Sequence, residues 1–179
     1  MNKTKVVPLI CIAMSFLVLA AGCTSNFGNP TPSATTNTYD SAKGFTINYP
    51  SDWTKDVPKS GAISVLFRMP TDNLAENFNV QIWNRSVNET LSNRTALHLA
   101  AVQEFSNYTE LSAGNNTLAG NPAYQVTYTA TYDGDDLKFT QLWTIKDGKE
   151  YLITYKADPK NFDTYASTAQ QMIDSFQIT

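Results

Sequence analysis

The chain has 179 residues, enough for one domain of ordinary size, and its 42% hydrophobic and 16% charged residues are typical of a folded globular protein. Its formal net charge of −3 and the lack of a clustered basic stretch argue against a nucleic-acid partner, because phosphate binding needs a concentrated basic surface. The two cysteines, Cys11 and Cys23, both lie near the N-terminus. Neither a disulfide framework nor a cysteine metal site is therefore available to the rest of the chain.

The first residues have the layout of a secretory signal. Lys3 and Lys5 form a short basic head, and residues 6–20 carry no charge. This uncharged stretch is shorter than the about 20 apolar residues that a membrane-spanning helix needs. We therefore expect export across a membrane rather than a spanning segment.

Small residues then lead to a cysteine in Leu19-Ala20-Ala21-Gly22-Cys23. This string resembles the lipobox of exported lipoproteins, in which the cysteine receives a lipid and becomes the first residue of the mature chain. We expect a signal peptide over residues 1–22, lipid attachment at Cys23, and a protein held at the outer face of the cell membrane. The alternatives are an ordinary cleaved signal and an uncleaved anchor, each with an incidental cysteine.

The segment after Cys23 is predicted to be a flexible linker. Residues 24–38 are uncharged and rich in Thr, Asn, Ser and Pro, a composition that gives little to pack. We assign residues 23–38 to the lipid-anchored linker and residues 39–179 to one folded domain.

The first part of this domain alternates apolar and polar residues with period two, which predicts strands. Phe45, Ile47 and Tyr49 share one face, and residues 62–69 are apolar on both faces, as in a covered central strand. In the next strand Trp83 is out of phase with its neighbours, so we expect it on the opposite face.

A helical period follows. Leu97, Ala101, Phe105 and Tyr108 recur at steps of three or four, which predicts an amphipathic helix over about residues 89–106. Ser86 and Glu89 have the spacing of a capping box at its start.

Three alternating segments then predict an antiparallel meander, near residues 124–132, 139–145 and 151–155. Asp133-Gly134 and Asp147-Gly148 connect them, and such dipeptides favour tight hairpins. The last segment predicts a helix, because Asp158 can cap it and Pro159 suits its first position. Its apolar stripe contains Phe162, Tyr165, Ala166, Ala169, Met172, Ile173 and Phe176. The fold class is therefore α+β, an antiparallel β-sheet sandwiched by α-helices.

Several short strings resemble the PsbP-like family over the whole of residues 39–179. The opening GFTINYPSDW, Gly120-Asn121-Pro122-Ala123-Tyr124, Gln141-Leu142-Trp143, Lys146-Asp147-Gly148 and the final Met172-Ile173-Asp174-Ser175-Phe176 carry the resemblance. These motifs are turns and core aromatics, so they specify a fold better than an activity. The resemblance implies the Mog1p/PsbP-like fold.

The resemblance also implies a role without catalysis. The photosynthetic family members are extrinsic subunits that help photosystem II to retain calcium and chloride, and Mog1p binds a small GTPase. Nothing in this sequence indicates photosynthesis. By this resemblance we expect a binding or assembly factor for an unidentified protein at the cell surface, with no cofactor.

Residue patterns for catalysis are weak. The one histidine, His98, falls within the predicted first helix, where we expect it to flank the apolar stripe rather than to act as a base. The sequence contains no Gly-x-Ser-x-Gly, phosphate loop or His-Glu-x-x-His motif, and no spacing points to a Ser-Lys or paired-carboxylate enzyme. A hydrolase with an unrecognised site stays an alternative.

One cluster of carboxylates could hold a hard cation weakly. Asp133, Asp135 and Asp136 lie in one turn and offer oxygen ligands, but their spacing is not that of an EF-hand loop. We interpret them as a solvated hairpin turn and predict no metal site. A calcium-binding or small-molecule-binding accessory module is the alternative function.

Five asparagines, each followed by x-Ser/Thr, make the chain a candidate glycoprotein. Asn84 is expected on the inward face of its strand, which disfavours a glycan there. Asn107 and Asn115, near the helix end and in the loop expected after it, are better sites. The glycosylation candidates are Asn88, Asn93, Asn107 and Asn115.

The three tryptophans, Trp53, Trp83 and Trp143, could line a ligand groove. We expect them in the core of a sheet between helices.

Overall fold

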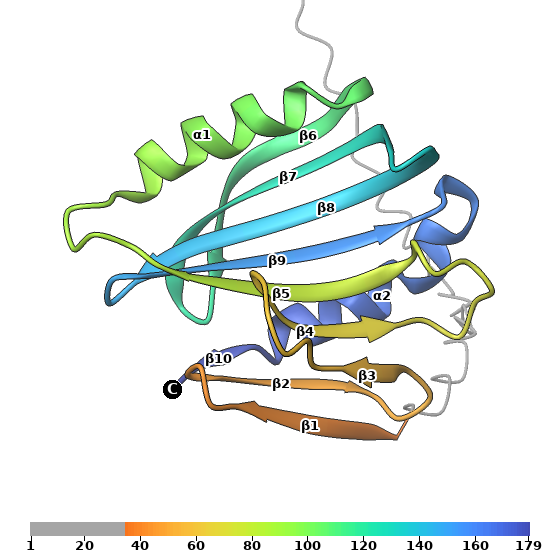
Figure 1. The fold of residues 1–179 in the computed structure, drawn as a ribbon, viewed down its shortest axis with the longest axis horizontal. Helices are drawn as coiled ribbons and strands as arrows, with labels where there is room; N and C mark the ends of the chain where they lie inside the picture. Colours follow the sequence, from red (N-terminus) through yellow and green to blue (C-terminus); the bar gives the residue numbers. More distant parts are fainter. Residues whose placement is uncertain (1–34) are drawn as a thin grey trace, which may run out of the picture. The chain divides into compact units, whose positions relative to one another are not determined.

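The computed structural model describes residues 35–179, which contain two helices and ten strands (Figure 1). The predicted signal peptide, Cys23 and most of the predicted linker lie outside these residues. The strands are β1 (Thr36–Ser41), β2 (Phe45–Pro50), β3 (Thr54–Asp56), β4 (Ile63–Arg68), β5 (Asn77–Asn84), β6 (Ser106–Leu118), β7 (Asn121–Tyr132), β8 (Asp135–Lys146), β9 (Lys149–Ala157) and β10 (Gln177–Ile178). The helices are α1 (Leu91–Gln103) and α2 (Pro159–Asp174).

The strands form two antiparallel sheets. Seven of them make the large sheet in the order β3-β4-β5-β9-β8-β7-β6, and a small sheet has the order β1-β2-β10. The two helices pack on opposite faces of the large sheet, α1 over β7 and β8, and α2 over β9 (Figure 1). The predicted α+β class, with an antiparallel sheet between helices, is therefore confirmed.

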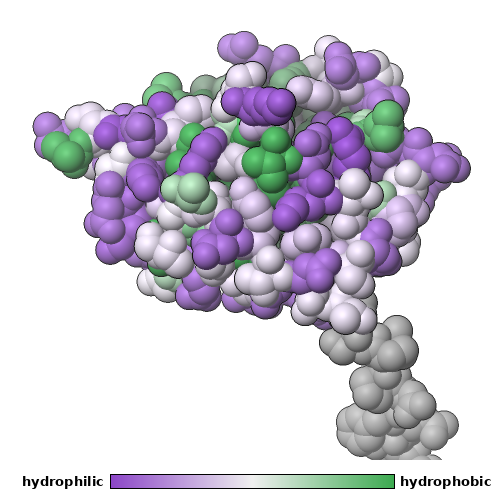
Figure 2. Space-filling view, turned by 60° about the horizontal axis from the view of Figure 1, so that its bottom comes forward, coloured by the Kyte–Doolittle hydropathy of each residue, from purple (hydrophilic) through white to green (hydrophobic). Residues whose placement is uncertain are grey.

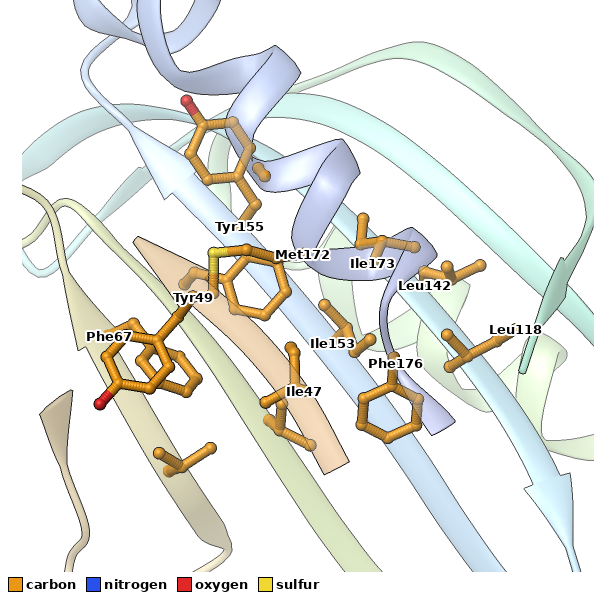
Figure 3. Close-up of a cluster of buried hydrophobic side chains, with 14 of the residues drawn as sticks. Ile47, Tyr49, Phe67, Leu118, Leu142, Ile153, Tyr155, Met172, Ile173 and Phe176 are labelled. Atoms are coloured by element: carbon orange, nitrogen blue, oxygen red, sulfur yellow. The ribbon is translucent and has the colours of Figure 1, made fainter. Parts of the chain in front are cut away.

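The main hydrophobic core lies between α2, the large sheet and β2. Met172 and Ile173 of α2 point toward Ile153 of the sheet, and Phe176 follows directly after the helix (Figure 3). Phe176 is fully buried, with its ring stacked 5.2 Å from that of Phe45. The small sheet is thus joined to the large one through aromatic packing at the end of α2.

A second, smaller core lies under α1. Trp143 and Tyr128 of the sheet are fully buried there beside Val102 of the helix, and Trp83 packs against the same cluster. Since Val80 of the same strand belongs to the first core, Trp83 faces the opposite side, as its phase predicts.

Three hairpins of the large sheet turn through pairs of residues with positive φ. Asp133-Gly134 and Asp147-Gly148 join β7 to β8 and β8 to β9, which confirms both predicted turns. Ala119-Gly120 joins β6 to β7 in the same way, with φ of 49° and 73°. The sequence did not predict this turn, because Ala is an unusual residue at positive φ.

The folded part begins earlier than predicted. Strand β1 starts at Thr36 and pairs with β2 from its first residue, Thr36 opposite Pro50. Residues 36–38 therefore belong to a strand and not to the linker. Their side chains are exposed, so their polar sequence gives no sign of the backbone pairing that makes them a strand.

The first helix is shorter than predicted and faces the sheet differently. Its N-cap is Thr90, whose Oγ1 accepts from the backbone N–H of Asn93, whereas Ser86 and Glu89 form a turn before it. Leu97 is 56% exposed, so the predicted apolar stripe does not define the buried face. Arg94, Thr95 and His98 of α1 face the sheet together with Val102.

Strand β6 was predicted as a loop. It has thirteen residues, of which only Leu118 is buried, and it forms an outer strand of the large sheet beside β7. Register shifts interrupt the pairing near Ser106 and Glu110. Such irregularities are common on outer strands. Together with the exposed polar side chains, they explain why the segment lacks the apolar–polar alternation that would predict a strand.

The surface is mostly polar. On the face drawn in Figure 2, apolar side chains stand in small separate groups among hydrophilic ones. Within residues 35–179 no helix combines the length and the hydrophobicity needed to cross a bilayer.

Replacing Phe176 with Ala should lower the free energy of unfolding by about 3–5 kcal/mol, because it removes the ring that connects the small sheet to the main core. Chemical denaturation measures this loss. Leu97→Ala, at an exposed position of α1, is the control and should change stability by less than about 0.5 kcal/mol. Similar losses in both variants would contradict the observed helix face.

Candidate functional site

The face of the large sheet that carries α1 is only partly covered by that helix. Beside the helix, over β4, β5, β9 and β8, lies a hollow of about 370 Å³, which we call the groove. Its walls are formed by Ile63, Leu66, Arg68, Asn77, Asn79, Gln81, Phe105, Tyr128, Tyr132, Phe139, Gln141, Thr154 and Lys156. A volume of this size lies within the range of small-molecule sites.

Two rows of side chains, each running across the strands, form the floor of the groove. Strand register places Arg68 opposite Asn77, Asn77 opposite Lys156, Lys156 opposite Phe139, and Phe139 opposite Tyr128. The neighbouring row contains Leu66, Asn79, Thr154 and Gln141. The first row thus runs from cationic residues on β4 and β9 to aromatic residues on β8 and β7.

Amide side chains fix one wall of the groove. Gln81 Nε2 donates to Asn79 Oδ1 (3.4 Å), Asn79 Nδ2 donates to Asn77 Oδ1 (3.0 Å), and Asn77 Nδ2 donates to the carbonyl of Ala75 (3.0 Å). The residues between them, such as Phe78 and Val80, point into the main core. Strand β5 therefore presents amides on one face and apolar groups on the other.

Two polar atoms in the groove walls have no hydrogen-bond partner among residues 35–179. Tyr128 Oη and Gln141 Oε1 are both buried and unpaired, although Gln141 Nε2 donates to Thr154 Oγ1 (3.3 Å). Burial raises the pKa of Tyr128, so its hydroxyl stays protonated and can donate as well as accept. Buried polar groups are usually satisfied, so two free ones in one hollow indicate a place for a further partner.

Lys156 is the most perturbed charge in the groove. Burial lowers its pKa below the ordinary value, an effect that the carboxylates of Asp133 and Asp135 partly offset and that the charge of Arg68 reinforces. Its Nζ lies 4.6 Å from the centre of the Tyr132 ring, a cation–π distance.

A separate charged cluster surrounds Glu150 under the N-terminal part of α1. The Glu150 side chain is fully buried, Arg85 Nε donates to its Oε2 at 2.6 Å, and His98 Nε2 donates to its Oε1. Arg94 Nε lies 3.1 Å from Oε2, but it is not aligned for a hydrogen bond and contributes as an ion pair. The centre of the His98 ring also lies 4.8 Å from that of the Trp143 ring, whose Nε1 donates to Thr95 Oγ1.

The charges of this cluster hold Glu150 ionised. Burial by itself would raise the pKa of Glu150, but the hydrogen bond and charge of His98, the hydrogen bond of Arg85 and the charge of Arg94 outweigh burial and lower the pKa to about 2. The cluster connects three parts of the fold, namely β9, α1 and the segment that follows β5. It therefore fixes α1 beside the groove.

His98 therefore has a different position from the predicted one. It faces the sheet and binds Glu150 rather than flanking an apolar stripe, and it is not among the residues that line the groove. Its Nε2 contact is with a carboxylate and not with a hydroxyl or thiol nucleophile. A histidine with its carboxylate makes two members of a catalytic triad, but within residues 35–179 no hydrogen bond joins His98 to a hydroxyl nucleophile, the third member.

The three aspartates of the predicted turn do lie in the β7–β8 hairpin, where Thr131 Oγ1 donates to Asp136 Oδ1 (2.6 Å). In the part of the chain that the structure describes, no three carboxylate, histidine or cysteine side chains are grouped so that they could hold a metal ion. Asp133, Asp135 and Asp136 thus do not converge on one point.

All the predicted glycosylation candidates are exposed, although in different surroundings. Asn88 precedes α1 and Asn93 lies in its first turn, whereas Asn107 and Asn115 lie on strand β6 and not in a loop. Asn84 was expected to face inward, but it is exposed at the end of β5.

The groove and the Glu150 cluster were both missed by the sequence interpretation. A signal for the groove was present, because Asn77, Asn79 and Gln81 alternate with apolar residues in an interior strand of the sheet. No comparable signal exists for the cluster, since Glu150 lies 52 residues after His98, and still further after Arg85 and Arg94, and meets them only through packing.

Comparison with known proteins agrees with this architecture. The sequence signature of the family described as PsbP-like protein matches residues 24–178. No curated protein matches the chain. The solution structure of the cyanobacterial PsbP, CyanoP, from Synechocystis sp. PCC 6803 is similar over 86% of this chain and 99% of its own, with 19% identity and a TM-score of 0.62.

A second solved structure shares the fold. LpqN of Mycobacterium tuberculosis, which is involved in cell envelope biogenesis, is similar over 81% of this chain and 91% of its own, with 12% identity and a TM-score of 0.58. At these identities the likeness concerns the fold alone.

The Glu150 cluster should make the protein sensitive to acid. Because the pKa of Glu150 is lowered from 4.5 to about 2, its carboxylate stabilises the fold fully above about pH 5, and this stabilisation is lost as the pH falls toward 2. Glu150→Gln should cost about 3 kcal/mol at pH 7 and should flatten the dependence of unfolding free energy on pH in this window. Denaturant unfolding at a series of pH values measures both effects.

Glu104→Gln is the matched control, since it removes the same charge from an exposed position at the end of α1. It should change the unfolding free energy by less than about 0.5 kcal/mol and leave the acid slope unchanged. An unchanged slope in Glu150→Gln would contradict the assigned role of the cluster.

Proposed function

The chain belongs to the PsbP-like family, and from this premise we propose that it is an exported lipoprotein whose domain acts as a non-catalytic accessory module for a protein at the outer face of the cell membrane. The signal-like N-terminus and Cys23 support the location. LpqN, a protein of similar fold, is involved in cell envelope biogenesis, and this supports a role at the cell surface.

The composition of the groove carries the proposal of binding without catalysis. Among its lining residues are amides, aromatics, Thr154 and two cations, but no histidine, carboxylate, serine or cysteine. Lys156 is the only one whose pKa is moved toward neutrality, and in residues 35–179 it makes no hydrogen bond to a hydroxyl nucleophile. A hollow with recognition groups and without a nucleophile–base pair suits binding.

Cys23→Ser tests the anchor. Without the thiol no lipid can be attached, so we expect the protein to be released or to remain as an unprocessed precursor. Membrane fractionation and mass spectrometry of the N-terminus measure this outcome. Cys11→Ser is the matched control and should leave the mature, membrane-bound form intact. Mature membrane-bound protein in the Cys23→Ser strain would contradict lipid attachment.

The accessory role is tested in the same strains. Cross-linking of intact cells should give a discrete adduct between the wild-type protein and one partner, and the adduct should decrease when Cys23→Ser releases the domain. An equally abundant adduct after release would show that the partner does not require the membrane location.

Calcium distinguishes the metal-binding alternative. Because the described domain contains no grouped set of ligands, we expect calorimetric titration with calcium chloride to give no binding heat and no change in melting temperature. A shift of several degrees that Asp133→Asn and Asp136→Asn abolish would favour the alternative.

A further inference from the structure

We infer that the groove beside α1 binds a small organic anion, with a carboxylate held between Arg68 and Lys156 and a flat apolar ring placed against the aromatic wall. The inference goes beyond the proposed accessory role. It does not depend on the anchor, since lipid attachment and groove binding are measured separately.

The two positive charges of the groove favour an anionic ligand. Arg68 and Lys156 are its only charged residues, and they lie on either side of Asn77 in one row of the floor. Within residues 35–179 neither cation has a carboxylate oxygen within 4.0 Å, and Asp133 and Asp135 influence Lys156 only from the adjacent turn, outside the groove walls. A carboxylate between the two cations would relieve their mutual repulsion and compensate the desolvation of Lys156.

The aromatic end of the same row favours a flat apolar group on the ligand. Phe105, Tyr132 and Phe139 form a wall there, with Phe105 and Phe139 near parallel at 6.5 Å and Tyr132 edge-on to both. Tyr132 is 41% exposed although it is a large aromatic residue. Aromatic rings of this kind stack on planar ligands, and covering Tyr132 would remove apolar area from water.

Two polar atoms of the groove walls are left unpaired by the described residues. Gln141 Oε1 is an acceptor without a donor, and Tyr128 Oη is free to donate or accept. Within residues 35–179 neither atom makes a hydrogen bond, and both residues line the groove. They provide a hydrogen-bonding position for a polar atom on the ring, such as the N–H of an indole.

Indole-3-acetate contains all three features and serves as the probe. Calorimetric titration of the full-length protein in detergent, with protein-free micelles as blank, should show binding. The neutral indole-3-acetamide has the same ring without the charge, and acetate has the charge without the ring. Both should bind at least about tenfold more weakly, because each lacks one of the two contacts.

Two variants on separate strands test the cations. Arg68→Gln and Lys156→Gln should each weaken binding of indole-3-acetate about tenfold and should leave binding of the neutral amide unchanged. Lys59→Gln, at an exposed position outside the groove, is the matched control and should bind like the wild type. Melting temperatures verify folding, and each cation variant is a sufficient test if the other does not fold.

The absence of binding of indole-3-acetate up to about 10 mM would overturn the inference, because this concentration exceeds the Kd of even weak specific sites. Equal binding of the acid by the wild type and by both folded cation variants would overturn it as well. Neither result would bear on the proposed membrane anchor, which Cys23→Ser tests alone.

Discussion

The buried carboxylate of Glu150 is the constraint on which the arrangement of the α1 face depends. Fully removed from water, it is stable as an anion only because Arg85, Arg94 and His98 converge on it. These partners come from the segment after β5 and from α1, so the charge fixes the helix against β9. Since α1 has just one buried apolar residue, Val102, hydrophobic packing by itself would position it weakly.

Fixing α1 in this way leaves part of the sheet uncovered. The helix packs on β7 and β8, whereas the amides of β5 and the polar residues of β9 stay at its side and form the groove together with Tyr128, Tyr132 and Phe139. On the opposite face α2 and β2 cover the sheet with a large apolar core. One face of the large sheet thus carries the main hydrophobic core, whereas the other carries the Glu150 cluster and the groove.

Much of the fold was predictable because its signals are local. The β7–β9 meander, its two Asp-Gly turns and α2 with its Asp158 cap were all predicted and are confirmed. The prediction of a loop in place of strand β6 was wrong, because the side chains of β6 are exposed and its strand conformation comes from hydrogen bonds to β7. Helix α1 was predicted as a helix, but its buried face was not, because Arg94 and His98 face the sheet beside Val102 whereas Leu97 is exposed, and a periodic pattern places polar residues outside.

By itself the sequence determined the α+β class, the family resemblance and the pattern of the central strands, because each rests on short-range periodicity or turn chemistry. It also supplied the lipobox-like string at Cys23, which is a linear motif. Only the tertiary structure decided where the polar residues go. Lys156 and Arg68 become neighbours across β5, and Glu150 meets His98 from 52 residues away, since antiparallel pairing and helix packing join positions that no sequence spacing relates.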